Sequence, residues 1–150
     1  FYLRLIRGSH IVLNRKVSGA FLFQEDLGKR IVFVLPYLGS TIIGTTEIPQ
    51  SINDEVRCSL DEKNYLLEIF NKHFKDKIDQ SSIIKDYSGL RPIVEKNTSK
   101  KETYFSFASR EAKIEPIDRL ITVYGGKWTS APSLSRKVAE KISKMERYID

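Results

Sequence analysis

The sequence has 150 residues, of which 41% are hydrophobic and 29% charged, a composition typical of a folded globular domain and unlike that of a disordered chain. The formal net charge is +6, but the basic residues are spread along the chain without an arginine-rich helix, which argues against nucleic acid and favours a small phosphate-bearing ligand. Cys58 is the only cysteine, so an intrachain disulfide and a cysteine-based metal site are excluded, and we expect no metal. The longest apolar run, 31–38, is too short to span a bilayer, so any membrane contact is expected to be peripheral.

Residues 1–50 predict an antiparallel β-meander. Alternating and apolar runs separated by turn residues indicate short strands at 2–6, 10–13, 20–24, 31–35 and 41–44. The first two are expected to be separated by a break at Gly8-Ser9. The run Ile31–Leu35 is apolar at every position, so we expect it to be central and covered on both faces.

A helix is predicted over residues 60–75. Ser59 and Glu62 have the spacing of a capping box, and apolar residues follow at helical spacing at Leu66, Leu67, Phe70 and Phe74. Charged residues are expected to form its solvated outer face; they are Glu62, Lys63, Glu68, Lys72 and Lys75. His73 is expected to be a surface or C-terminal capping residue.

Arg91 is unusual because it lies among apolar residues directly before a proline. Pro92 holds the preceding residue in an extended conformation, which fixes the direction of the arginine. A buried guanidinium needs a partner, and either a carboxylate of the fold or the anion of a ligand can supply it. The residues alone leave these two possibilities open.

The stretch 120–130 predicts a buried strand that runs through two glycines into a helix. Gly125 and Gly126 allow a tight turn and a close approach to a ligand, and Thr129 or Ser130 can cap the helix that follows. Lys127 stands at this helix start, where an anionic or electron-rich ligand is favoured, although a plain turn with a solvated lysine is an equal possibility. Two further strands are expected before it, at 104–108 and 112–114, followed by a turn at 116–119. A final amphipathic helix is predicted from the spacing of apolar residues between 134 and 149, with Pro132 in its first turn.

Five motifs occur in the order and approximate spacing found in the FAD-dependent glycerol-3-phosphate dehydrogenases. They are RGSHIV at 7–12, RIVFVLP at 30–36, IGTT at 43–46, YSGLRP at 87–92 and YGGKWT at 124–129. The chain resembles this family over nearly its whole length. The resemblance implies an α+β fold in which an antiparallel β-sheet packs against helices, the substrate domain of a D-amino-acid-oxidase-like flavoprotein. It implies that residues 1–150 form a single domain covering substrate and flavin, a piece of a longer polypeptide.

The resemblance also implies roles for individual residues. His10 is similar to the histidine proposed in the family as the catalytic base for the substrate hydroxyl, and Arg91 to its active-site arginine. Arg110, with Arg119 as the alternative, and Lys127 join Arg91 in binding the substrate. The residues implied in cofactor binding are Gly125, Gly126, Lys127 and Thr129.

The chain departs from the family pattern at three places. No Gly-x-Gly-x-x-Gly occurs, so most of the FAD-binding part is expected to be absent and the chain alone is not expected to retain FAD. Glu47 stands where the family usually has aspartate. Ala131-Pro132 stands where the family usually has an arginine, which puts any contact made through that arginine in doubt.

The implied activity of the complete protein is the oxidation of sn-glycerol 3-phosphate to dihydroxyacetone phosphate, with electrons passed through FAD to a quinone. A related oxidase that uses oxygen is the neighbouring possibility. The implied location is cytoplasmic, peripheral to the cytoplasmic membrane, with a homodimer possible, and the isolated chain is expected to be inactive. The alternative is a noncatalytic remnant that binds a phosphate metabolite or a partner chain.

Overall fold

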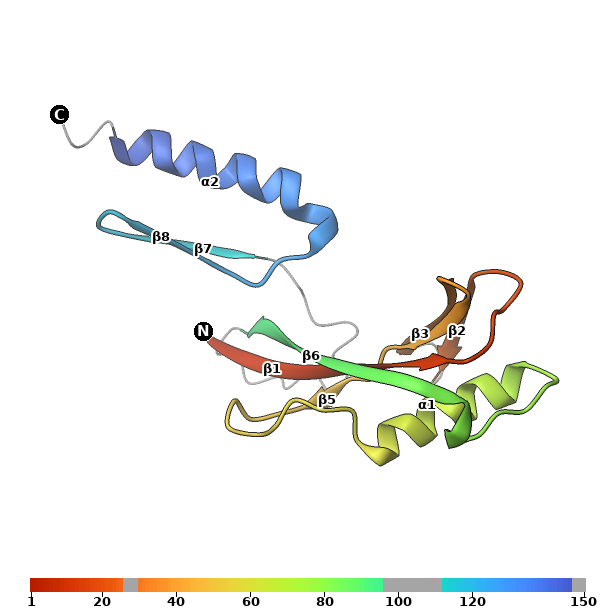
Figure 1. Ribbon diagram of the computed structural model, residues 1–150. Coiled ribbons are helices and arrows are strands. Elements are labelled where there is room, and N and C mark those ends of the chain that lie inside the picture. Colours follow the sequence, from red (N-terminus) through yellow and green to blue (C-terminus); the bar gives the residue numbers. More distant parts are fainter. Residues whose placement is uncertain (26–29, 96–111, 147–150) are drawn as a thin grey trace. The chain divides into compact units, whose positions relative to one another are not determined.

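The computed structural model describes residues 1–25, 30–95 and 112–146, and the strand expected at 104–108 lies outside them. The chain divides into two compact units (Figure 1). We call residues 5–91 the sheet unit, and the described residues 1–4, 92–95 and 112–146 the hairpin unit. The expectation of a single domain stays a prediction.

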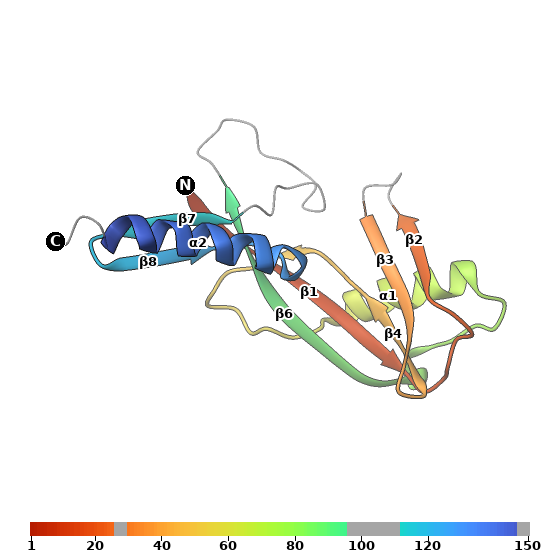
Figure 2. The same ribbon diagram turned by 90° about the horizontal axis from the view of Figure 1, so that it is seen from above.

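The sheet unit is built on six strands (Figure 2). Their bounds are β1 Tyr2–Leu13, β2 Phe21–Glu25, β3 Arg30–Tyr37, β4 Ser40–Gly44, β5 Ile48–Pro49 and β6 Ile83–Glu95, with the ends of β1 and β6 continuing into the hairpin unit. The order is β2-β3-β4-β1-β5, and β6 also pairs with β1. The meander is therefore confirmed for β2, β3 and β4, whereas β1 pairs with β4 and not with its neighbour in sequence.

The break expected at Gly8-Ser9 is wrong, because β1 runs through both residues without interruption. Ser9 is fully buried, and its backbone N–H donates to the Thr46 hydroxyl at 2.9 Å while its carbonyl accepts from the Thr46 N–H at 3.3 Å. Pairing on both edges of the strand thus outweighs the local turn preference of the Gly-Ser dipeptide.

The two faces of the sheet differ. Ile11, Ile43 and Val34 lie on one face and pack against α1 (Leu60–His73), which covers that face of the sheet. On the other face, Phe33 of β3 stays 42% exposed, so the expectation that this strand is covered on both sides is wrong for the described chain. The strand is central in its hydrogen bonding, since β2 and β4 pair with it on either side. We call this uncovered side the open face.

Helix α1 confirms the helix predicted at 60–75, with its end two residues earlier than expected. Ser59 and Glu62 form the capping box, in which each side chain accepts from the backbone N–H of the other residue. Leu66 and Phe70 are buried against the sheet. A short 3₁₀ helix, η1 (Gln80–Ser82), then leads into β6.

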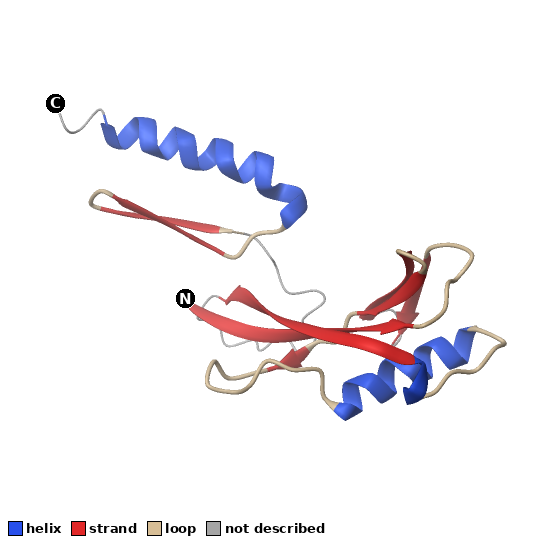
Figure 3. Cartoon of the chain, in the orientation of Figure 1, coloured by secondary structure: helices blue, strands red, loops and turns tan. Residues whose placement is uncertain are grey.

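The hairpin unit contains a two-stranded sheet and a helix beside it (Figure 3). Its elements are β7 Lys113–Ile117, β8 Leu120–Tyr124, the 3₁₀ helix η2 Trp128–Ser130 and α2 Ala131–Glu146. The turn between the strands is shorter than expected, because Pro116 pairs with Ile121 inside the ladder. The final helix is confirmed, with Pro132 in its first turn.

Candidate functional site

His10 lies on the open face, held between two other motifs of the sequence. Its register partner is Gly44 of β4, and a Cβ at Gly44 would stand 2.1 Å from His10 Cδ2, so glycine is required for the ring to lie there. On its other side the imidazole stacks on the Tyr87 ring from β6, with centroids 4.8 Å apart and planes 7° apart. The imidazole is therefore held between two strands.

The surroundings of His10 favour its neutral form. Burial lowers the pKa of His10 below its ordinary 6.5, and the positive charge of Arg91 lowers it further. Within the described structure, Nδ1 is enclosed and has no hydrogen-bond partner. A neutral imidazole at physiological pH is the form that accepts a proton.

Arg91 of β6 lies across β1 at Gly8. A Cβ at Gly8 would stand 2.2 Å from Arg91 Nη2, which means that the guanidinium occupies the space a side chain would need. Nη2 donates to the Thr45 hydroxyl at 2.7 Å, and Nη1 donates to the Thr46 carbonyl at 3.5 Å. The extended conformation expected from Pro92 is confirmed, because both residues lie within β6.

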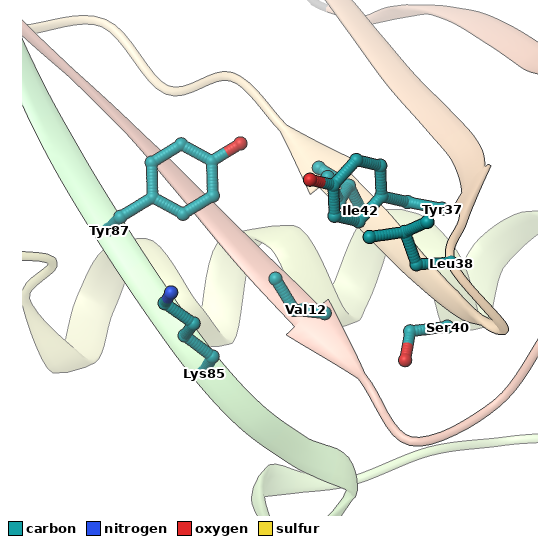
Figure 4. A pocket seen from close by; sticks show the side chains of 7 residues that line it. All are labelled: Val12, Tyr37, Leu38, Ser40, Ile42, Lys85 and Tyr87. Atoms are coloured by element: carbon teal, nitrogen blue, oxygen red, sulfur yellow. The ribbon is translucent and has the colours of Figure 1, made fainter.

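A hollow of about 260 Å³ opens beside Tyr87 (Figure 4). Its lining residues come from four strands and a turn: Val12, Tyr37, Leu38, Ser40, Ile42, Lys85 and Tyr87. Burial raises the pKa of Tyr87, and the nearby Tyr37 raises it further, so the Tyr87 phenol stays protonated and able to donate. The hollow is mainly apolar, and Lys85 supplies the positive charge among its lining residues.

Glu62 does not lie on the solvated face of α1, as its charge suggested, but is buried with 3% of its surface exposed. Its carboxylate accepts from the hydroxyls of Thr46 at 2.6 Å and Ser9 at 2.7 Å. It also accepts from the Ser59 N–H at 2.9 Å and pairs with Arg7 Nη2 at 2.8 Å. Burial raises the pKa of Glu62, but the hydrogen bonds from Thr46, Ser59, Ser9 and Arg7 outweigh it and lower the pKa to about 2.

The glycine turn of the hairpin unit has the conformation that its sequence indicates. Gly125 and Gly126 have φ values of +70° and +100°, which side chains disfavour. The Ser130 hydroxyl, and not that of Thr129, closes the turn: it accepts from the Lys127 N–H at 3.2 Å and donates to the Lys127 carbonyl at 3.0 Å. Strand β8 before this turn is not buried as expected within the described chain, since Leu120 is 63% exposed.

The remaining predicted site residues are not brought together. Lys127 belongs to the hairpin unit and Arg91 to the sheet unit, so their expected action on one substrate stays a prediction. Arg110 lies outside the described residues, and its alternative Arg119 lies exposed in the turn between β7 and β8. The roles of Gly125, Gly126 and Thr129 toward a cofactor also stay predictions.

The described residues contain neither a metal-ligating cluster of His, Cys, Asp and Glu nor a helix long and apolar enough to cross a membrane. Cys58 is buried as a free thiol, and burial raises its pKa, as is typical of a structural cysteine.

A family model described as FAD dependent oxidoreductase matches residues 1–141. The chain belongs to this family. It is 33% identical over 150 residues to the aerobic glycerol-3-phosphate dehydrogenase of Escherichia coli (strain K12), an alignment that covers 94% of this chain and 29% of the relative. It is also 33% identical over 141 residues to the D-erythritol 1-phosphate dehydrogenase of Brucella abortus (strain 2308), with 89% and 27% covered.

The fold of this family member also matches a solved structure. The glycerol-3-phosphate dehydrogenase from Bacillus halodurans, complexed with FAD, superposes with a TM-score of 0.75 at 23% identity, over 95% of this chain and 27% of that one. This likeness confirms the α+β fold with its antiparallel sheet, and the resemblance seen in the motifs is confirmed as well. The chain spans less than a third of the length of these relatives.

The sequence did not reveal Tyr87, Gly8 or Gly44 as parts of the site. All three lie inside motifs that carried the resemblance, but their contact with His10 and Arg91 depends on the pairing of β1 with β4 and β6. Gly44, at the end of the strand predicted at 41–44, was the available signal, since glycine in a strand often marks the close approach of another group.

Proposed function

We propose that this chain is the substrate-side part of an FAD-dependent dehydrogenase that oxidises sn-glycerol 3-phosphate to dihydroxyacetone phosphate. The observation that carries the proposal is the convergence of two motifs on the open face, where His10 of the first meets Tyr87 and Arg91 of the second. Family membership and relatives named for the oxidation of phosphorylated polyols support the same conclusion.

His10 is proposed to take the proton of the C2 hydroxyl. Burial and the charge of Arg91 keep its imidazole neutral, as a base must be before the reaction. Nδ1 is enclosed by protein atoms, which leaves Nε2 as the nitrogen that takes the proton. The stack on Tyr87 and the contact with Gly44 hold the ring in one orientation while the proton moves.

Arg91 is proposed to bind an oxygen of the substrate. Its guanidinium is held at the edge of Gly8 and donates to the Thr45 hydroxyl and the Thr46 carbonyl. The planar fork of a guanidinium suits a phosphate or the developing carbonyl oxygen. Lys127, Arg110 and the glycine turn are proposed to complete the binding of substrate and cofactor.

The residues of the open face fit the ring end of FAD. Phe33 and Leu22 lie in the same cross-strand row as His10 and Gly44, and both are exposed, which gives a planar aromatic group an apolar surface beside the base. When bound, FAD accepts the hydride from the substrate carbon. We propose that the nucleotide end is held by other parts of the complete protein, because the chain has no Gly-x-Gly-x-x-Gly.

We propose a quinone as the electron acceptor of the complete enzyme, which would act on the cytoplasmic side of the cytoplasmic membrane, attached peripherally. Reduction of a soluble quinone under anaerobic conditions, compared with oxygen consumption, tests the acceptor. Co-sedimentation of the complete protein with lipid vesicles tests the membrane attachment. Sedimentation of the same protein without vesicles reports a homodimer if one forms.

The central test is the steady-state kcat/KM of the complete flavoprotein with sn-glycerol 3-phosphate, in which Arg91→Lys is compared with the control Lys72→Ala. Lysine keeps the charge but loses the planar fork, and we expect a loss of about 30- to 1,000-fold, which corresponds to about 2–4 kcal/mol. Lys72 is 61% exposed, and its ion pair with Glu25 lies at the surface, where such pairs contribute little. Its removal should therefore change kcat/KM by less than about twofold. Flavin content is measured in each protein.

A complete protein that holds flavin but oxidises neither sn-glycerol 3-phosphate nor D-erythritol 1-phosphate would refute the proposed activity and favour the noncatalytic remnant. Near wild-type efficiency in Arg91→Lys would instead leave the activity standing and make Arg91 a structural residue. The sequence upstream of Phe1 offers a further check, since an intact Gly-x-Gly-x-x-Gly unit is expected for the enzyme.

A further inference from the structure

We propose that Glu62 is the positioning residue of this site: through Ser9 and Thr46 it fixes the segments that carry His10 and Arg91. The inference rests on the proposed function for its kinetic part and on the geometry of the sheet unit for the rest. Glu62 does not touch the substrate face, and we assign it no chemical step.

The carboxylate of Glu62 joins three separate segments at one point. Ser59 belongs to the start of α1, Ser9 to β1 and Thr46 to the loop after β4, and each donates to it at 2.9 Å or less. Ser9 extends the network into β6, because its hydroxyl lies 2.8 Å from that of Ser88. A hydrogen-bonded centre of this kind holds loops and strands in one arrangement, since any shift leaves a buried polar group unpaired.

The first branch of the network leads to His10 and its stacking partner. Ser9 and Ser88 are the sequence neighbours of His10 and Tyr87, and consecutive strand residues point to opposite faces. The Ser9–Ser88 contact on the covered side therefore sets the separation of the two strands that bring His10 and Tyr87 into their 4.8 Å stack.

The second branch leads to Arg91. Thr46 donates from its hydroxyl to Glu62 at 2.6 Å, and its carbonyl accepts from Arg91 Nη1 at 3.5 Å. The preceding residue, Thr45, accepts from Arg91 Nη2 at 2.7 Å. The loop that orients the guanidinium is thus anchored by Glu62 through a single side chain.

Helix capping alone does not account for this arrangement. A capping box needs only the reciprocal bonds between Ser59 and Glu62, which a solvent-exposed glutamate makes equally well. Here the glutamate is buried, and Arg7 supplies a compensating charge at 2.8 Å, itself held by Gln50 at 2.6 Å. Burying an ion pair gives little or no net stability compared with an apolar pair, so a role in orienting the site explains what stability does not.

The kinetic test uses the complete flavoprotein with Glu62→Gln, with Thr46→Val as a milder variant and with Glu68→Gln as the control on the exposed face of the same helix. Misplacing reacting groups by about 1 Å costs on the order of 100-fold in rate, so we expect kcat per bound flavin to fall at least about tenfold in Glu62→Gln and at least about threefold in Thr46→Val. Glu68→Gln should stay within about twofold. All rates are measured at a temperature where each variant is fully folded, so a purely stabilising role would leave kcat unchanged.

A second readout needs neither flavin nor activity. In the 150-residue chain, the stacked Tyr87 ring should shift the His10 ring protons upfield. We expect Glu62→Gln and Thr46→Val to move these NMR signals toward their unfolded positions. His73, the other histidine, stacks on Phe23 away from the network, and its signals serve as an internal control. Unmoved His10 signals in a folded Thr46→Val chain would overturn the inference even if Glu62→Gln does not fold.

The two readouts separate the inference from the proposed function. A complete protein without any dehydrogenase activity, but with His10 signals that move in both variants, would refute the function and retain Glu62 as the residue that sets the geometry. A normal kcat in the folded variants of an active enzyme would refute the inference and leave the function intact.

Discussion

The lowered pKa of the buried Glu62 carboxylate leads to a quantitative prediction about stability in acid. Its pKa falls from the ordinary 4.5 to about 2, because the hydrogen bonds from Thr46, Ser59, Ser9 and Arg7 outweigh the effect of burial. Each tenfold change in proton affinity is about 1.4 kcal/mol, so the folded state prefers the charged form by about 3 kcal/mol relative to the unfolded chain. Since the pKa is lower in the folded state, this stabilisation is present above pH 4.5 and is lost as the pH falls toward 2.

Glu62→Gln removes this pH-dependent contribution. We expect the free energy of unfolding of the sheet unit to be about 3 kcal/mol lower than in the wild type at pH 7, and the two proteins to converge as the pH approaches 2. Other carboxylates with lowered pKa values, such as Glu25 and Glu95, weaken both proteins equally in acid. The difference between the two proteins at each pH therefore isolates the contribution of Glu62.

The assay is urea unfolding at several pH values, followed by NMR signals of Leu66 and Phe70, which are buried beneath the sheet and report on that unit alone. Fluorescence of Trp128 would be misleading, since it lies 93% exposed in the hairpin unit. Glu68→Gln, on the exposed side of α1, is the matched control and should change stability by less than about 0.5 kcal/mol. A constant difference between wild type and Glu62→Gln from pH 7 to pH 2 would refute the reasoning.

Three further predictions concern the site. Gly8→Ala places a Cβ 2.2 Å from Arg91 Nη2, so the flexible end of this side chain must move and lose its hydrogen bonds to Thr45 and Thr46. We expect the free energy of unfolding to fall by about 1 kcal/mol in urea titrations, whereas Gly89→Ala, which meets nothing within 4 Å, should be nearly neutral; equal effects would contradict the packing. His10 should titrate below pH 6.5 in an NMR titration, so its contribution to stability is full above pH 6.5 and declines as the pH falls below it. Arg91→Gln should bring the pKa of His10 only part of the way back to 6.5, because burial is the larger cause of the shift; a pKa above 6.5 in the wild type would refute this. The purified chain should be colourless, because only contacts to the ring end of FAD are expected here; a stoichiometric flavin absorption band would overturn this expectation.

The sequence by itself determined those features that depend on local chemistry. The capping box at Ser59 and Glu62 set the start of α1, and Pro92 held Arg91 in an extended strand. The pair Gly125-Gly126 gave the positive φ values of the turn, because glycine adopts them without a steric penalty. The order of the five motifs was enough to indicate the family and, with it, the fold.

The burial of Glu62 could be predicted from helical spacing in the sequence, although the charge of this residue favoured the opposite interpretation. Glu62 precedes Leu66 by four residues and Ile69 by seven, so helical spacing places it on the buried face of α1. Its charge nevertheless favoured a solvated position, since glutamate is rarely buried without partners. The partners that compensate this charge, Arg7 and Thr46, are far away in sequence and could not be assigned to it in advance.

Only the tertiary structure decided how the strands pair, and this pairing makes the site. Gly8 and Ser9 have the composition of a turn, yet the partners on both sides of β1 keep them in a strand. That choice puts His10 over Gly44 and Arg91 over Gly8, contacts between residues more than 30 positions apart. Short-range propensities act within a few residues, whereas the register of this sheet is set by the burial of one whole face against α1. The site therefore depends on the packing of the sheet and not on its separate motifs.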